Sequence, residues 1–157
     1  MGSKPKAAIS LRYANDVRLK SNMITALYCR TAQASDMGIE TQENMLRSYA
    51  EENSLSNVSV YTDNGYSGLN FDRPALRRLK ADVDAGLVGS VLVRDISRIS
   101  RNFDEAPKFL EYMWTKGVMV KSIMDGFDSE ERIYALQEIA QAFNQFYTKS
   151  KRGAKAL

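Results

Sequence analysis

Histidine is absent from the 157-residue sequence, and cysteine occurs only once, at Cys29. Without histidine the chain cannot hold a Ser-His-Asp triad, a Cys-His pair or a histidine-based metal site, and a single cysteine removes cysteine-cluster sites as well. Cys29 lies in an apolar, strand-like run, so disulfides are not part of the design, as expected in a reducing cytoplasm. We therefore expect no metal and no cofactor, and phosphate chemistry would rest on arginine, lysine, carboxylates and hydroxyls.

Long apolar runs are also lacking. No segment approaches the roughly 20 apolar residues that a membrane span needs, and no signal-peptide pattern opens the chain, so we expect a cytoplasmic protein without membrane contact. The 22 basic and 19 acidic residues leave a net charge of +3. So small an excess does not by itself indicate nucleic-acid binding, because the distribution of charge matters more than its sum.

The chain is long enough for one compact α/β domain and too short for two. Residues 1–22 show no sustained periodicity and open with a tag-like Met-Gly-Ser, so we treat them as an extension, a tag or a disordered arm, outside the fold. From residue 23, mostly apolar strand segments (24–29, 58–61, 91–93 and 118–123) alternate with segments of helical periodicity. This alternation predicts a four-stranded, mainly parallel sheet with helices on both faces over residues 23–127, followed by a long C-terminal helix over 128–157.

Helix starts are predicted from capping residues. Asp72 is expected to cap the helix that begins near Pro74. Asn102 and Glu105 have the spacing of a capping box. Asp128 is expected to open the last helix, which carries an apolar stripe longer than the small sheet needs. That stripe predicts an interface with a second subunit, and it consists of Leu136, Ile139, Phe143 and Phe146.

Polar clusters follow the first three predicted strands, and ligands of parallel sheets gather at the carboxyl ends of the strands. We expect four arginines from these clusters to surround one point: Arg30, Arg73, Arg98 and Arg101. The planar guanidinium donates parallel hydrogen bonds and keeps its charge, which suits a phosphate. The spacing of Arg98 and Arg101 places both on one face of a helical turn, with Ile99 toward the core. A solvated basic face is the simpler explanation of each arginine alone, but a weaker explanation of the set.

The motifs in these clusters resemble the resolvase/invertase family of serine site-specific recombinases, most closely the large serine recombinases of transposons and phages. The likeness is carried by Tyr-x-Arg at 28–30, by Asp-x-Gly-Tyr-Ser-Gly at 63–68 with Asp-Arg-Pro at 72–74, and by Asp-Ile-Ser-Arg-Ile-Ser-Arg-Asn at 95–102. The Phe-Asn-Gln-Phe-Tyr stretch at 143–147 is similar to the start of the family's long dimer-forming helix. The match runs from about residue 23 to the end, and the motifs are specific only jointly.

The resemblance implies metal-free DNA recombination, integration included, through phosphoryl transfer. A serine attacks a DNA phosphodiester and forms a phosphoserine link, subunits exchange, and the freed hydroxyl rejoins the strands. The catalytic positions would be Arg30, Ser67, Arg73, Arg98 and Arg101, with support from Tyr28, Gln42, Asp63 and Ser97. It also implies double-stranded DNA as partner, a homodimer that becomes a tetramer in the synaptic complex, and a C-terminal DNA-binding domain that is absent from this sequence. The basic residues Lys149, Lys151 and Arg152 would approach the DNA backbone, with a solvated basic tail as the equal alternative.

One position departs from the family pattern Tyr-x-Arg-x-Ser, because the nucleophilic serine is replaced by Ala32. A methyl group cannot attack phosphorus. Thr31 is expected to point to the opposite face of its strand, which leaves Ser35 as the candidate displaced nucleophile, although an ordinary loop hydroxyl is the simpler assignment.

Ala32 has three explanations at this stage: an engineered knockout, a natural degenerate recombinase, or an enzyme with a displaced hydroxyl. The first two leave the chain inactive. From a different class, the chain could be a non-catalytic DNA-binding or dimerisation module that regulates a mobile element. A nucleotide-binding enzyme ranks third, because the sequence has neither a Gly-x-Gly-x-x-Gly turn nor a Gly-x-x-x-x-Gly-Lys-Ser/Thr loop.

Overall fold

The computed structural model describes residues 22–102 and 104–129. Strands and helices alternate along this part of the chain. Their order is β1 (Ile24–Thr31), α2 (Asp36–Glu52), β2 (Val58–Asn64), α3 (Pro74–Asp84), β3 (Val88–Val93), the 3-10 turn η1 (Ile96–Arg98), α4 (Glu105–Thr115), β4 (Met119–Ser122) and β5 (Phe127–Asp128). Within those residues, no helix is both long and apolar enough to cross a membrane.

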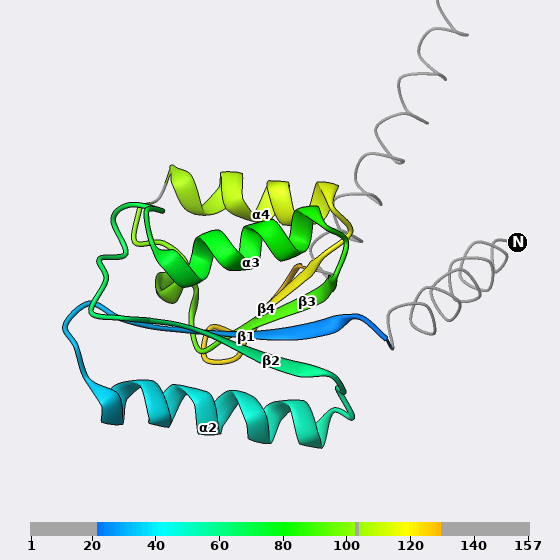
Figure 1. Ribbon diagram of the computed structural model, residues 1–157, viewed down its shortest axis with the longest axis horizontal. Coiled ribbons are helices and arrows are strands. Elements are labelled where there is room, and N and C mark those ends of the chain that lie inside the picture. The colour runs from blue at the N-terminus through cyan, green and yellow to red at the C-terminus, as the bar shows by residue number, and fades with distance from the viewer. Residues whose placement is uncertain (1–21, 103, 130–157) are drawn as a thin grey trace, which may run out of the picture.

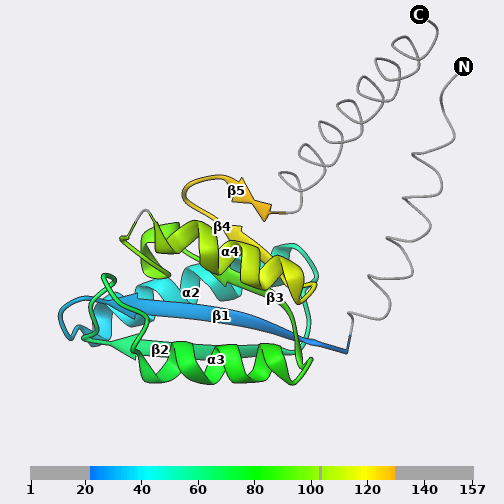
Figure 2. The ribbon, with the colours of Figure 1, turned by 90° about the horizontal axis from the view of Figure 1, so that it is seen from above.

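The strands form one sheet in the order β2-β1-β3-β4-β5. The first four pair in parallel, and the two-residue β5 runs antiparallel to β4. Helix α2 covers one face of the sheet, and α3 and α4 lie side by side on the other (Figures 1 and 2). The predicted four-stranded, mainly parallel sheet with helices on both faces is thus confirmed, with β5 as an additional short edge.

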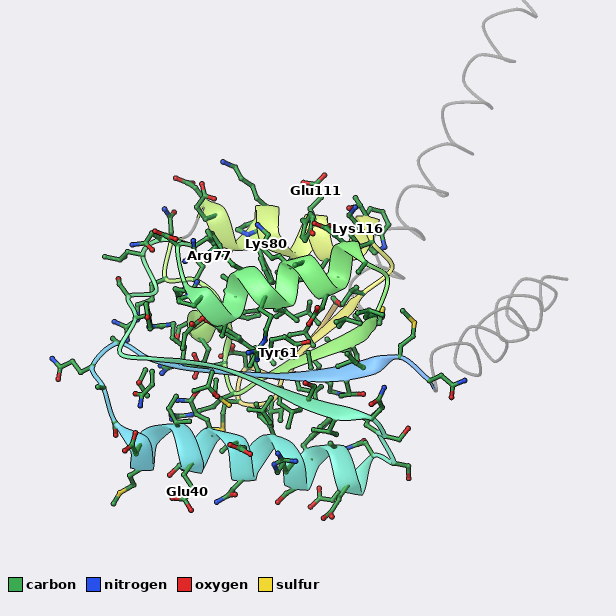
Figure 3. All side chains as sticks on the ribbon, in the orientation of Figure 1. Glu40, Tyr61, Arg77, Lys80, Glu111 and Lys116 are labelled. Carbon is green, nitrogen blue, oxygen red and sulfur yellow. The ribbon has the colours of Figure 1, made fainter. Side chains whose placement is uncertain are left out.

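Strand β1 lies between β2 and β3 and has buried residues toward both faces of the sheet, which explains its nearly continuous apolar sequence from Ile24 to Cys29. Ala26 and Tyr28 belong to the core beneath α3 and α4, while Leu27 and Cys29 belong to the core beneath α2. Because side chains alternate along a strand, Arg30 follows Tyr28 toward the face of α3. Outward-facing positions carry charge, as Figure 3 shows for Glu40 on α2 and Glu111 on α4.

The predicted cap of α3 was wrong. The residue that precedes the helix is Arg73, which makes no side-chain cap, and Asp72 pairs instead with Arg77 at 3.2 Å. The free N–H groups of the first turn are satisfied from β2, because the Asp63 carboxylate accepts hydrogen bonds from the N–H groups of residues 75 and 76 at 2.8 and 3.0 Å. The Asp63 carboxylate on β2 therefore caps α3 in place of a residue at the start of the helix itself.

The start of α4 differs from the predicted capping box. Asn102 accepts a hydrogen bond from the Asp104 N–H at 2.9 Å, but its own N–H donates to Ser100 Oγ at 3.0 Å, and Glu105 pairs with Lys108. In a capping box the Glu105 side chain would accept a hydrogen bond from the Asn102 N–H. Here the Ser100 hydroxyl accepts it instead. Asp128 ends β5, and a helix begins directly after it at Ser129, so Asp128 stands where the sequence predicts the start of the last helix. The expected long helix and its apolar and basic residues lie outside the described residues.

Candidate phosphate-binding site

The backbone of Arg30 is fixed by Gln42, which is buried on α2. Gln42 Oε1 accepts a hydrogen bond from the Arg30 N–H at 3.1 Å, and Gln42 Nε2 donates to the Arg30 carbonyl at 2.9 Å. Arg98 Nη1 donates a second bond to the same carbonyl, also at 2.9 Å. The last residues of β1 are thereby held at the carboxyl edge of the sheet, which lies at the left in Figure 1.

The Arg30 side chain is fully buried and binds backbone carbonyls of two different loops. Its Nε and Nη2 donate to the carbonyls of Arg98 and Ser97 at 2.8 and 2.7 Å. Its Nη1 donates to the carbonyl of Tyr66 at 2.8 Å. Arg30 therefore ties the loop after β2 to the turn after β3.

The Arg73 side chain is equally buried and binds the same turn from the start of α3. Its Nη1 donates to the carbonyl of Arg98 and to the hydroxyl of Tyr28, both at 2.8 Å, and its Nη2 donates to the carbonyl of Ile99. Its guanidinium also lies 5.7 Å from the centre of the Tyr28 ring. Two buried arginines thus share the carbonyls of the turn at 97–99.

Tyr28 and Asp63 support this arrangement from within the sheet. The Tyr28 hydroxyl donates to the Asp63 carboxylate at 2.7 Å, so one oxygen links the carboxylate to the guanidinium of Arg73. Burial raises the pKa of Tyr28 well above its ordinary value, and the Asp63 hydrogen bond acts in the same direction. The phenol therefore remains a neutral donor at physiological pH.

The other two arginines are nearer to solvent. The Arg98 side chain is 16% exposed and pairs with Asp95 at 3.4 Å, while Arg101 is exposed. Ser97 donates its hydroxyl to Asp95. Burial acts to raise the pKa of Asp95, but the Ser97 hydrogen bond and the charge of Arg98 outweigh it, so the pKa is lowered.

Positive charge accumulates in this cluster. Burial lowers the pKa of the Arg30 guanidinium to about 10, and the nearby charges of Arg73, Arg98 and Arg101 contribute to the same shift. Among residues 22–102 and 104–129, none of the ion pairs includes Arg30 or Arg73. Asp95 is the carboxylate that pairs within the cluster, so the cluster attracts anions.

The approach of the loop to the cluster requires glycine at Gly68. A Cβ there would lie 2.7 Å from Arg30 Nη2 and 3.1 Å from Arg101 Cγ. The Gly68 carbonyl accepts a hydrogen bond from the Arg101 N–H at 2.8 Å. Gly68 therefore separates the side chains of a buried and an exposed arginine, whereas the neighbouring Ser67 is exposed and binds the N–H of Leu69.

Ala32 is exposed and lies just beyond β1, which ends at Thr31. The alternation of an extended strand therefore does not extend as far as position 32. Thr31 is buried, as expected of the opposite face, and its hydroxyl donates to Asn64 at 2.7 Å. Ser35 is the N-cap of α2, and its hydroxyl accepts a hydrogen bond from the Gly38 N–H at 3.0 Å.

The structure brings the predicted catalytic and supporting residues of β1, β2, α3 and η1 to one edge of the sheet. The guanidiniums of Arg30 and Arg73 are directed at carbonyls rather than at an open point, so binding of one anion by all four arginines stays a prediction. Sequence reasoning missed Asn64, which binds Thr31, the Ser35 N–H and Asp36, and it missed the separating role of Gly68. Turn-forming residue types were the signal available for both.

Comparisons with known proteins agree on one family. Residues 25–155 match the family model "Resolvase, N terminal domain". A curated relative, the putative DNA recombinase of Bacillus subtilis (strain 168), is 46% identical over 44 residues, which are 28% of this chain and 9% of that protein. The match thus spans a small part of the relative's length.

Solved structures show the same fold. The N-terminal catalytic domain of TP901-1 integrase superposes with a TM-score of 0.66 at 27% identity, over 82% of this chain and 98% of that one. The C-terminal catalytic domain of ISC1926 TnpA, an IS607-like serine recombinase, gives a TM-score of 0.59 at 26% identity, over 77% and 82% of the two chains. A resolvase family site-specific recombinase from Streptococcus pneumoniae, 24% identical over 85% of this chain and 98% of that one, shares the fold with a TM-score of 0.59.

Proposed function

Because the chain belongs to the family of resolvase N-terminal domains, we propose that it is the catalytic domain of a serine site-specific DNA recombinase whose nucleophile position is occupied by Ala32. The observation that carries the proposal is the cluster of four arginines at the carboxyl edge of the sheet. Two of them are fully buried, and within residues 22–102 and 104–129 their donors bind backbone carbonyls and a phenol rather than carboxylates. Their positive charge is therefore left without a paired anion, and a DNA phosphate bound at the solvent-facing Arg98 and Arg101 balances it.

The arginines divide into two roles. Arg101 and Arg98, which are nearer to solvent, bind the phosphoryl oxygens, where removal of one preorganised donor typically costs on the order of 10²–10³ in rate. Arg30 and Arg73 act mainly as positioning residues, because their donors hold the carbonyls of residues 97–99 and so set the course of the turn that carries Arg98 and Arg101. Their charges add to the field at the phosphate.

In the reaction of an active member, a serine oxygen forms a bond to phosphorus while the bond to a deoxyribose oxygen breaks. The departing oxygen takes up a proton, and the phosphate stays on the serine. The reverse attack by a deoxyribose hydroxyl rejoins the strand and frees the serine. Arginines alone polarise the phosphate but supply no nucleophile in line with the leaving group. With alanine at position 32, the chain binds DNA and does not cleave it.

The test is a suicide duplex that carries the cognate recombination site, offered to the full-length gene product, with covalent adducts resolved on a denaturing gel. The chain with Ala32 should give none, and Ala32→Ser should give adducts. Ala34→Ser is the matched control, because it adds the same hydroxyl to an exposed residue two positions along the same loop. Adducts from the Ala32 protein that map to Ser35 would identify a displaced nucleophile. Their absence from both proteins, with DNA binding intact, would favour the non-catalytic regulator of a mobile element.

Assembly is part of the same proposal. The apolar stripe at 136–146 forms a homodimer interface, which becomes part of a tetramer on synapsis, and the basic residues at 149–152 follow the DNA backbone. Sedimentation velocity tests the first point: Phe143→Asp together with Phe146→Asp should yield a monomer. An unchanged sedimentation coefficient would contradict it.

A further inference from the structure

The loop at 65–72 is anchored at almost every residue. The N–H groups of Gly65 and Tyr66 donate to the Thr31 carbonyl, both at 2.9 Å. The carbonyls of Tyr66 and Gly68 accept from Arg30 and from the Arg101 N–H at 2.8 Å each. Towards α3, the carbonyl of residue 70 accepts from Arg73, and the ring of residue 71 stacks on that of residue 109 with centroids 5.8 Å apart.

Between these anchors, Leu69 is held outward. Its N–H donates to Ser67 Oγ at 3.1 Å, while its side chain is 67% exposed. Tyr66 on the same loop is 39% exposed. A single exposed leucine is ordinary on a protein surface. Here the leucine is presented by a fixed backbone, and the residue before it is hydrogen-bonded to the backbone of Arg101, the most exposed arginine of the cluster.

We propose that Leu69, with Tyr66 on the same loop, packs against the sugars and bases of the DNA duplex next to the phosphate that Arg101 binds. This inference rests on the proposed function and adds a non-ionic contact to it. Duplex DNA is the occupant that the charges favour, because the loop adjoins a group of four arginines and the apolar surface of a nucleotide always lies within a few ångströms of its phosphate. Minor-groove binding proteins commonly combine arginine or lysine with apolar side chains that contact the base steps.

The experiment measures binding of the 157-residue chain to a fluorescent random-sequence duplex by anisotropy, at several salt concentrations. Leu69→Ser should weaken binding about tenfold, because an apolar side chain of this size loses its buried area. The dependence of log affinity on log salt should keep its slope, since no phosphate contact is lost. Arg101→Gln should instead lower the slope by about one.

Leu87→Ser is the matched control. Leu87 is 50% exposed, and its carbonyl accepts a hydrogen bond from Ile24 at the start of β1, so it lies at the opposite end of the sheet. The control should bind the duplex as the unaltered chain does. Thermal unfolding of both serine variants establishes that the fold is intact.

Each outcome is decisive. Equal affinity of the unaltered chain and Leu69→Ser overturns the inference and leaves the proposed function standing. A failure of the unaltered chain to bind duplex DNA at the lowest salt overturns both. A change in sedimentation coefficient with unchanged DNA affinity would assign Leu69 to a contact between protein subunits, and that too overturns the inference.

Discussion

Gln42 forms two hydrogen bonds with the backbone of Arg30, accepting from its N–H and donating to its carbonyl. The pairing of β1 with β3 ends at Tyr28 and Val93, two residues before Arg30. Gln42 therefore makes the hydrogen bonds to the Arg30 backbone that β3 would make if it continued. A helix side chain thereby prolongs the sheet to the point where the arginine cluster begins.

Replacement of Gln42 by leucine should lower the free energy of unfolding by about 2–4 kcal/mol, because two buried backbone groups lose a partner. Urea denaturation measures the change. Thr41→Ala on the neighbouring exposed position, where the hydroxyl donates to the carbonyl of Met37, should cost less than about 1 kcal/mol. Equal losses in the two variants would contradict this account of Gln42.

Asp63→Asn should destabilise the protein by about 2–3 kcal/mol, because an amide replaces a buried carboxylate that accepts from Tyr28 and from two N–H groups of α3. The same substitution at Asp72, whose side chain is 80% exposed in its pair with Arg77, should cost less than about 1 kcal/mol. The difference between the two variants gives the contribution of Asp63 as the cap of α3. Chemical denaturation measures the free energy of unfolding of both. A larger loss of stability in Asp72→Asn than in Asp63→Asn would contradict this account and would favour Asp72 as the cap of α3.

Gly68→Ala should displace Arg30 or Arg101, since the added methyl lies 2.7 Å from a guanidinium nitrogen. We expect a loss of about 1–3 kcal/mol, typical of overpacking in a buried site, and weaker duplex binding. Gly38→Ala is the control, because its Cβ lies 3.0 Å from Ser35 Oγ and 3.2 Å from a methyl of Thr31, which is less close than at Gly68, and alanine improves helix propensity by up to about 1 kcal/mol. Wild-type stability and DNA affinity in Gly68→Ala would show that the cluster tolerates the methyl.

Asp95 predicts an acid-dependent component of stability. Its pKa is lowered in the folded protein, so its carboxylate stabilises the fold above the ordinary value of about 3.9, and this contribution is lost as the pH falls through the lowered pKa. Asp95→Asn should therefore be less stable than the unaltered chain at pH 7, with the difference shrinking in acid. Urea midpoints from neutral pH down to about pH 3 test the sign. A difference that grows on acidification would reverse the assignment.

Much of the fold could be predicted because its signals are local. Strand segments that are apolar on both faces predicted the parallel sheet, and Ile99 between two arginines predicted a turn with one core residue, which is 1% exposed. Helix starts were less predictable. Asp72 has the right residue type and place for a cap, but Asp63, nine positions earlier in the chain, takes that role through tertiary contact.

The candidate site shows the same division. Strand order alone placed Arg30, Arg73 and Arg98 at a common edge. That two of them are fully buried, with carbonyls as partners, could not be predicted, because arginine is among the residue types least often buried and sequence does not show which backbone groups lack partners.

The position of β1 between two strands that follow it in the sequence governs when the arginine cluster can form during folding. This strand comes first among the described strands, yet it pairs with β2 and β3, which lie some 33 and 64 positions further along the chain. Such non-local pairing slows folding, because the entropy of the connecting segments is lost before the contacts between the strands can stabilise the chain. Arg30 binds the Tyr66 carbonyl of the loop after β2, but it acquires its other two carbonyl partners, at residues 97 and 98, only when the turn after β3 is present. The arginine cluster is therefore assembled late, and a nascent chain that has not yet completed β3 lacks it.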